Sequence, residues 1–104
     1  LRICVPSAKF FYPVMKLGFL PQPSDPARMA ALIGPSRSKL ILMGGQKITA
    51  DEALNFGLVD RIVADDALME SARSIVSDTI AAAPDIASGI KSMCAASASP
   101  AEVL

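Results

Sequence analysis

The chain has 104 residues, of which 52% are hydrophobic and 19% are charged, and its formal net charge is zero. A chain of this length forms one domain at most, and its lysines and arginines are dispersed, so neither a nucleic acid nor a membrane is favoured as a partner. Histidine is absent, and Cys4 and Cys94 lack metal-like spacing. We therefore expect no metal site and no histidine base; two buried thiols are the first interpretation and a disulfide the alternative.

Short strands are predicted at the start of the chain. Residues 1–5 have the pattern of a strand, and residues 9–12 form a second extended piece before Pro13. Residues 14–23 are expected to be a loop, because prolines at 21, 23 and 26 disfavour regular structure.

Two helices are predicted next. Asp25 is placed to cap a helix over residues 26–33, with Pro26 at its favoured first position and Gly34 as its stop. A second helix starts at residue 35 or 36 and ends at the glycine pair 44–45. Its apolar side is expected to contain Leu40, Ile41 and Met43.

The stretch from residue 45 to residue 63 predicts one short helix followed by one short strand. Thr49 and Glu52 have the spacing of a capping box, with Ile48 and Ala53 placed as the hydrophobic staple around it. Gly57 lies where a helix ends in a left-handed residue. Such ends matter here, because an isolated helix of two turns is unstable in water.

The last part of the chain is predicted to be helical. Asp65 or Asp66 caps one long amphipathic helix that runs to about residue 83. Pro84 starts a final helix with apolar residues at 86, 90, 93 and 94. The alanine- and serine-rich tail after residue 95 is expected to fray.

Several short matches in this order resemble the crotonase superfamily, the enoyl-CoA hydratases and isomerases. The strongest is the run G-x-x-I-T-A-D-E-A-x-x-x-G-L-V-D-x-I-V from Gly45 to Val63. Upstream matches follow the family's order and comprise Ala8-Lys9-Phe10, Pro13, Lys16-Leu17-Gly18, Pro21, Arg28 and Leu32-Ile33-Gly34. The resemblance covers residues 1 to about 95.

The resemblance implies an α/β crotonase-like fold in which this segment is mostly helical, with two or three short strands. Residues 1–104 would form the C-terminal part of a single crotonase-like domain, with residues 1–23 as the end of the spiral core and 24–104 as the helical region. The chain begins at Leu1 inside a predicted strand, which also favours a fragment. No apolar run is long enough for a membrane span and nothing resembles a signal peptide, so a cytoplasmic location is expected.

In this family two backbone N–H groups form an oxyanion hole for the thioester carbonyl, and hydratases add two glutamates that activate water. The resemblance places both N–H donors and the first glutamate outside these 104 residues. Where the family has Pro-Glu-x-x-x-Gly, this chain has Val14 after Pro13 and Gly18 four residues later. Valine cannot transfer a proton, so the two-carboxylate hydration route is not expected, and no catalytic residue is assigned here.

The resemblance also implies where an acyl group would bind. Val14, Phe19, Leu20 and Pro21 are candidates for an acyl pocket, with ordinary core as an equally supported interpretation. Gln22 lies where some isomerase relatives place an acidic residue and could bind substrate or water, although a solvated loop amide is the simpler interpretation. Asp25 could be a displaced acid or base, but a helix cap already explains it.

The other polar candidates have structural explanations as well. Arg37, Lys39 and Lys91 could meet the phosphates of coenzyme A, but solvated surface charge is the stronger interpretation. Tyr12 could donate to a thioester, but a half-buried aromatic residue is commoner. Asp51 and Glu52 are explained by the capping box and the helix dipole.

The sequence therefore predicts an enoyl-CoA hydratase or isomerase acting on an acyl-CoA thioester, with coenzyme A as part of the substrate and no separate cofactor. The alternatives are an acyl-CoA-binding protein without turnover and a part that serves assembly. Family members form trimers, sometimes paired, so a homotrimer or hexamer is expected. The high apolar content predicts that this piece packs against missing sequence or a second copy.

Overall fold

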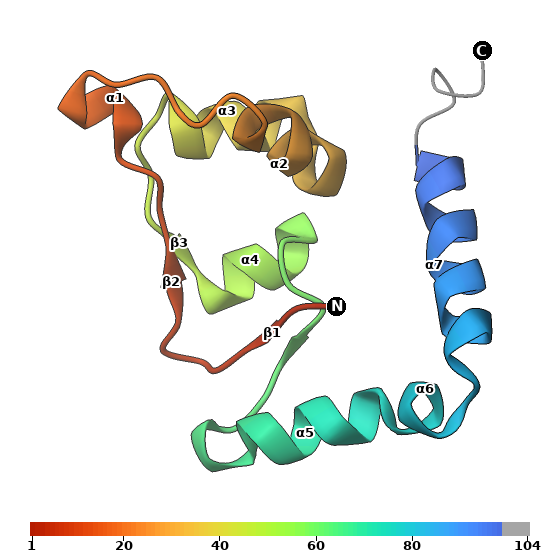
Figure 1. Cartoon of the computed structure of the whole chain (residues 1–104). Coiled ribbons are helices and arrows are strands. Elements are labelled where there is room, and N and C mark those ends of the chain that lie inside the picture. Colours follow the sequence, from red (N-terminus) through yellow and green to blue (C-terminus); the bar gives the residue numbers. More distant parts are fainter. Residues whose placement is uncertain (99–104) are drawn as a thin grey trace. The chain divides into compact units, whose positions relative to one another are not determined.

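The computed structural model describes residues 1–98, with side chains described through residue 95. The chain forms two compact units, Leu1–Leu68 and a second that begins at Met69. Figure 1 shows the elements of each unit in sequence order. Short strands and helices alternate in the first unit, whereas the described part of the second is helical.

The first unit contains four two-residue strands, four α-helices and one 3-10 turn. In chain order they are β1 (Ile3–Cys4), β2 (Lys9–Phe10), α1 (Val14–Leu17), α2 (Asp25–Ile33), α3 (Pro35–Leu42), β3 (Ile48–Thr49), α4 (Ala50–Phe56), β4 (Arg61–Ile62) and η1 (Asp65–Ala67). At the junction of the units α5 (Leu68–Ile75) begins, and α6 (Ser77–Ala81) and α7 (Pro84–Ala98) follow it. The expected fold class, mostly helical with a few short strands, is confirmed.

The strands form two separate pairs. β1 pairs with β4 in parallel, with Cys4 opposite Ile62, and β2 pairs with β3 in antiparallel fashion, with Phe10 opposite Ile48. Residues beyond the ladder extend the first pair, because the Asp60 N–H donates to the Arg2 carbonyl at 2.7 Å and the Val63 N–H donates to the Cys4 carbonyl at 2.9 Å. Hydrogen bonds between residues nearly sixty positions apart in sequence thus fix the start of the chain against β4.

The core of the first unit is small and lies around α4. Figure 1 shows the α2–α3 pair on one side of this helix and β1 on its other side. The buried hydrophobic residues in the described part of the chain are Cys4, Ile33, Ile41, Ile48, Ala50, Ala53 and Val59. One cluster therefore joins both strand pairs to all of the longer helices of this unit.

The ends of α4 confirm the capping prediction. The Thr49 hydroxyl accepts from the Glu52 N–H at 3.2 Å, and the Glu52 carboxylate accepts from the Thr49 N–H at 3.1 Å. At the other end Gly57 has a φ of 86°, and the Leu58 N–H donates to the Ala53 carbonyl at 2.9 Å. Polar groups that a two-turn helix leaves unpaired thus find partners at both ends.

The predicted loop over residues 14–23 is wrong at its start, because residues 14–17 form α1. Pro13 precedes this helix, and Gly18, with a φ of 75°, ends it. The Phe19 N–H then donates to the Val14 carbonyl at 2.9 Å. Gly18 adopts the left-handed backbone without the strain of a side chain, which lets the helix end after one turn, and the prolines at 21, 23 and 26 lie beyond it.

The single long helix predicted up to residue 83 is also wrong. It is divided into η1, α5 and α6, with no side-chain cap from Asp65 or Asp66. The break lies at Val76, whose backbone is not helical at a φ of −102° and a ψ of 14°, and the Ser77 hydroxyl donates to the Ser74 carbonyl at 2.9 Å. Serine hydroxyls that bond nearby carbonyls compete with helical hydrogen bonds, which explains the interruption.

The cysteine prediction is half right. Cys4 is buried in the core cluster, but Cys94 on α7 is exposed, and both thiols are free. The prediction failed at Cys94 because it assumed a covered apolar stripe on α7, whereas Ile86 and Ile90 on that helix are also more than half exposed. No helix among residues 1–98 has both the length and the apolar character needed to cross a bilayer.

We expect Gly57→Ala to lower the free energy of unfolding by about 1–2 kcal/mol, because a side chain disfavours the left-handed backbone. The cost is conformational rather than steric, since an added Cβ would meet the Leu32 carbonyl oxygen at 3.4 Å, an ordinary contact. Gly89→Ala in α7 is the matched control, with no neighbour within 4 Å. Its helical position predicts a gain of up to about 1 kcal/mol. Equal effects in urea unfolding would contradict this account.

Candidate functional site

A hollow of about 490 Å³ opens beside α3 and is the strongest candidate for a site in the first unit. We call it the α3 hollow. Its lining is almost wholly apolar and consists of Val14, Met15, Phe19, Leu20, Pro21, Pro26, Ala30, Pro35, Ser38, Lys39, Leu42 and Met43. Its size and apolar lining are typical of pockets that bind small organic groups.

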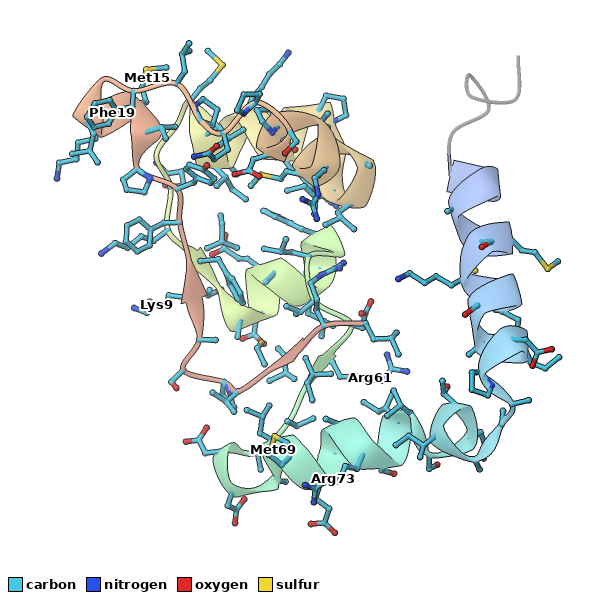
Figure 2. The ribbon with its side chains drawn as sticks, viewed as in Figure 1. Lys9, Met15, Phe19, Arg61, Met69 and Arg73 are labelled. Atoms are coloured by element: carbon cyan, nitrogen blue, oxygen red, sulfur yellow. The ribbon has the colours of Figure 1, made fainter. Side chains whose placement is uncertain are left out.

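One wall of the hollow is formed by residues 13–24, which we call the 13–24 segment. It supplies five of the twelve lining residues, and Met15 and Phe19 lie around α1 in Figure 2. The turn at Gly18 reverses the chain after α1. The exposed fraction is 67% for Phe19 and 93% for Leu20, so the tip of this wall has little cover from the described residues.

The other wall is the pair of helices α2 and α3. Gly34 separates them, and Pro35 starts α3. The buried Ser38 hydroxyl donates to the Gly34 carbonyl at 2.8 Å, which satisfies a polar group beside the hollow. The opposite side of the helix pair packs into the core through Ile33 and Ile41. This wall is therefore fixed by the core.

A hydrogen bond joins the two ends of the 13–24 segment. The Tyr12 hydroxyl donates to the Asp25 Oδ2 at 2.6 Å and accepts from the Gln22 N–H at 3.3 Å. The prediction that Asp25 caps α2 is wrong, since Ser24 holds the N-cap position and makes no side-chain cap bond. Asp25 lies one position inside the helix, and its carboxylate binds the hydroxyl of Tyr12 in a charge-assisted hydrogen bond.

This arrangement alters the acidity of Tyr12. The hydrogen bond to Asp25 raises the pKa of the Tyr12 hydroxyl above its ordinary value, because the bond requires the protonated phenol. The Gln22 N–H acts in the opposite direction by stabilising the phenolate. Partial removal from water and the nearby carboxylate charge add to the increase. At neutral pH Tyr12 is therefore a neutral donor.

Four of the five residues predicted to bind substrate line the α3 hollow. These are Val14, Phe19, Leu20 and Pro21, while Gln22 is exposed and lies outside the lining. The Gln22 side chain therefore has no place in the hollow, although its backbone N–H binds Tyr12.

The three candidate cations have different surroundings. Arg37 lies over the Phe56 ring at 4.7 Å from its centroid and donates to the Phe56 carbonyl at 3.4 Å. Lys39 is exposed and lines the α3 hollow. Lys91 is exposed on α7 in the second unit. Only Lys39 of these three lies at the hollow, and Asp51 and Glu52 belong to α4 as expected.

Seven lining residues were not among the candidates for substrate binding or for phosphate contact. Five of them lie on α2 or α3 with helical spacing, Met43 follows the end of α3, and the seventh is Met15 on α1. Residues 35, 38, 39 and 42 are three or four positions apart, so they share one face of α3. That spacing was visible in the sequence, but it did not show whether the face meets the core or a hollow.

The lining limits the chemistry that these residues can perform. It contains no carboxylate, cysteine or histidine, and its ionisable side chain is Lys39. In the described part of the chain, no group of three or more potential metal ligands lies together. The hollow can enclose an apolar group. Acid–base catalysis needs side chains that transfer protons, and the apolar side chains of the lining cannot do so.

The chain is similar to proteins of one family. The model of the enoyl-CoA hydratase/isomerase family matches residues 1–103. A carnitinyl-CoA dehydratase from Citrobacter koseri is 37% identical over 82 residues, which are 79% of this chain and 31% of that protein. The chain therefore spans about a third of the length of the curated relatives it matches.

Solved structures share the fold. An enoyl-CoA hydratase/isomerase family protein from Hyphomonas neptunium has a TM-score of 0.84 at 33% identity, over 92% of this chain and 37% of that one. An enoyl-CoA hydratase/carnitine racemase from Magnetospirillum magneticum has a TM-score of 0.85 at 29% identity, over 96% and 38%. The fold is that of the crotonase superfamily, and the chain belongs to the enoyl-CoA hydratase/isomerase family.

We expect Asp25→Ala to lower the pKa of Tyr12 towards its usual value of about 10. The folded pKa lies above the unfolded one, so the stability from this bond is fully present below the unfolded pKa and is lost as pH rises through the folded pKa. Tyrosinate absorbance would measure the titration directly, because Tyr12 is the single tyrosine among the 104 residues. An unchanged Tyr12 pKa in Asp25→Ala would contradict the assigned cause.

Proposed function

We propose that the α3 hollow is the acyl-binding side of an acyl-CoA site in an enoyl-CoA hydratase/isomerase family enzyme. The observation that carries the proposal is the apolar hollow formed by Val14, Phe19, Leu20 and Pro21 together with α2 and α3. An acyl chain packs against such carbon surface and gains about 0.8 kcal/mol for each buried methylene group. A purely polar substrate would gain little from the apolar part of this lining.

The relatives support a thioester substrate. The family model names enoyl-CoA compounds, and the Citrobacter koseri relative is named for the dehydration of carnitinyl-CoA. We infer that this chain takes part in binding a CoA thioester, with coenzyme A as part of the substrate. Lys39 at the hollow is the cation best placed to attract a phosphate or carboxylate of such a ligand.

The reaction proposed here does not use a carboxylate at position 14. Val14 lines the hollow where the resemblance implies a glutamate, and its side chain can only make apolar contacts. An oxyanion hole supplied by N-terminal sequence of the family would polarise the thioester carbonyl, and other groups would direct the chemistry. Isomerisation or another enolate reaction fits this arrangement better than two-glutamate hydration.

A non-catalytic acyl-CoA-binding protein of the same fold is the second candidate. The observation that favours it is the same lining, since none of its twelve residues is a carboxylate or a histidine. A binder needs only the apolar hollow and a cation for the head group. Tight binding of thioesters without formation of any product would favour this second function.

We also propose that the protein is a homo-oligomer, as a trimer or hexamer. Support comes from apolar side chains on α6 and α7, where Ile80, Ile86 and Ile90 are 70%, 56% and 57% exposed. Apolar surface of this kind is typical of residues that a neighbouring copy covers. A monomer in sedimentation equilibrium would contradict this proposal.

The cytoplasmic location stays a prediction.

Leu20→Asp is expected to weaken binding of octanoyl-CoA at least about tenfold, because a buried acyl chain would face an unpaired carboxylate. Leu20 is 93% exposed, so the change leaves the core intact. Leu17→Asp is the matched control, because Leu17 is also exposed and in the same segment but does not line the hollow. Calorimetry that shows equal losses for both variants would contradict the assigned site.

Crotonyl-CoA is expected to be hydrated far below the rate of a two-glutamate hydratase. General acid–base groups contribute about 10²–10⁴-fold each, so the absence of one carboxylate at position 14 costs a factor in that range. The measurement is the loss of the conjugated thioester absorbance with the purified protein. Turnover at the rate of an ordinary hydratase would exclude the proposed role of Val14.

A further inference from the structure

The 13–24 segment is closed at its base by one hydroxyl group. Tyr12 precedes the segment, Asp25 follows it, and the Tyr12 hydroxyl joins them through the 2.6 Å bond to Oδ2. The same oxygen accepts the Gln22 N–H from within the segment. The side chain of Tyr12 thus connects the two ends of the segment and also binds Gln22 near its C-terminal end.

The rest of the segment has few restraints. Its other backbone hydrogen bonds lie within the turn of α1 or reach only Tyr12, Asp25 and Arg28 next to it. In the described structure none of its hydrogen bonds reaches α3, and Phe19 and Leu20 are largely exposed. The hydrogen bonds that fix the position of this wall are therefore those at its base.

Asp25 is the first residue of α2, so a bond to its carboxylate connects the segment to the wall that the core fixes. We propose that Tyr12 is a positioning residue that sets the separation of the two walls of the α3 hollow, and thereby the size of acyl group that fits between them. This inference rests on the proposed function, because it assumes that the hollow binds an acyl chain.

The first measurement needs no ligand. Tyr12→Phe keeps the ring and removes both hydrogen bonds of the hydroxyl. Loss of both bonds predicts that amide hydrogen exchange at Phe19 and Gln22 accelerates roughly tenfold. Amides of α4 should keep their wild-type exchange rates. Asp25→Asn still presents an acceptor oxygen and should retain slow exchange at both amides. Asp25→Ala should accelerate exchange at Phe19 as Tyr12→Phe does, with a smaller effect at Gln22, whose N–H keeps the Tyr12 oxygen as its acceptor.

Thr49→Ala is the control for a general loss of stability. It removes a helix cap far from the 13–24 segment in sequence and so lowers the stability of α4. Its exchange rates should rise around α4 and not selectively at residues 19 and 22. Equal acceleration of the segment in Thr49→Ala and Tyr12→Phe would overturn the positioning role.

The second measurement compares ligands of different size. Calorimetry would give the Kd values of free coenzyme A, crotonyl-CoA and octanoyl-CoA for each variant. Tyr12→Phe should change the octanoyl-to-crotonyl affinity ratio at least about fivefold and leave the affinity for coenzyme A unchanged. The ratio in Asp25→Asn and in Thr49→Ala should equal that of the wild type.

The outcomes separate this inference from the proposed function. The role of Tyr12 is supported if Tyr12→Phe accelerates amide exchange at Phe19 and Gln22 but not in α4, and also changes the octanoyl-to-crotonyl affinity ratio. Thioester binding with an unchanged ratio in Tyr12→Phe overturns that role and leaves the proposed function standing. A wild-type protein that binds none of the thioesters overturns the proposed function and, with it, the inference about acyl size.

Discussion

The first unit is organised around the buried side chain of Ala53 on α4. Its side chain has no exposed surface, and α4 contacts β2, β3 and β4 around it. Its carbonyl also accepts the N–H groups of Leu58 and Val59, which end the helix and direct the chain towards β4. A small side chain lets the helix approach the strands closely, and a larger one would force this close-packed contact apart. The α2–α3 pair joins the same cluster through Ile33 and Ile41, so the fixed wall of the α3 hollow depends on it.

The candidate site combines a fixed wall with a weakly restrained one. The α2–α3 wall has its opposite side in the core, whereas the 13–24 segment has mainly the hydrogen bonds of Tyr12 at its base. Binding sites often combine a rigid scaffold with an adjustable loop, because the scaffold holds the ligand in place and the loop selects it. The family membership identifies the fold, but the groups in this hollow determine which reaction it can support. Here those groups are apolar apart from Ser38 and Lys39.

Local signals in the sequence were reliable where neighbouring residues satisfy one another. The capping box of Thr49 and Glu52 and the left-handed Gly57 were predicted correctly, because each involves groups within a few positions of the chain. The prediction failed at Asp25, whose carboxylate had a local role available but binds Tyr12 thirteen residues away. It also failed at Val76 and at Cys94, where apolar periodicity alone predicted a continuous helix and a covered stripe. Periodicity identifies a face but not what lies against it.

The sequence by itself determined the family, the two ends of α4 and the absence of a glutamate at position 14, since all of these depend on residue identity and short spacing. Val14, Phe19, Leu20 and Pro21 were also singled out before the fold was known. Only the tertiary structure brought them opposite Pro35, Lys39 and Leu42, and only it joined Tyr12 to Asp25. The physical reason is that a hollow and a hydrogen bond between separate elements depend on distances in space, which the core around Ala53 fixes and the order of residues does not state.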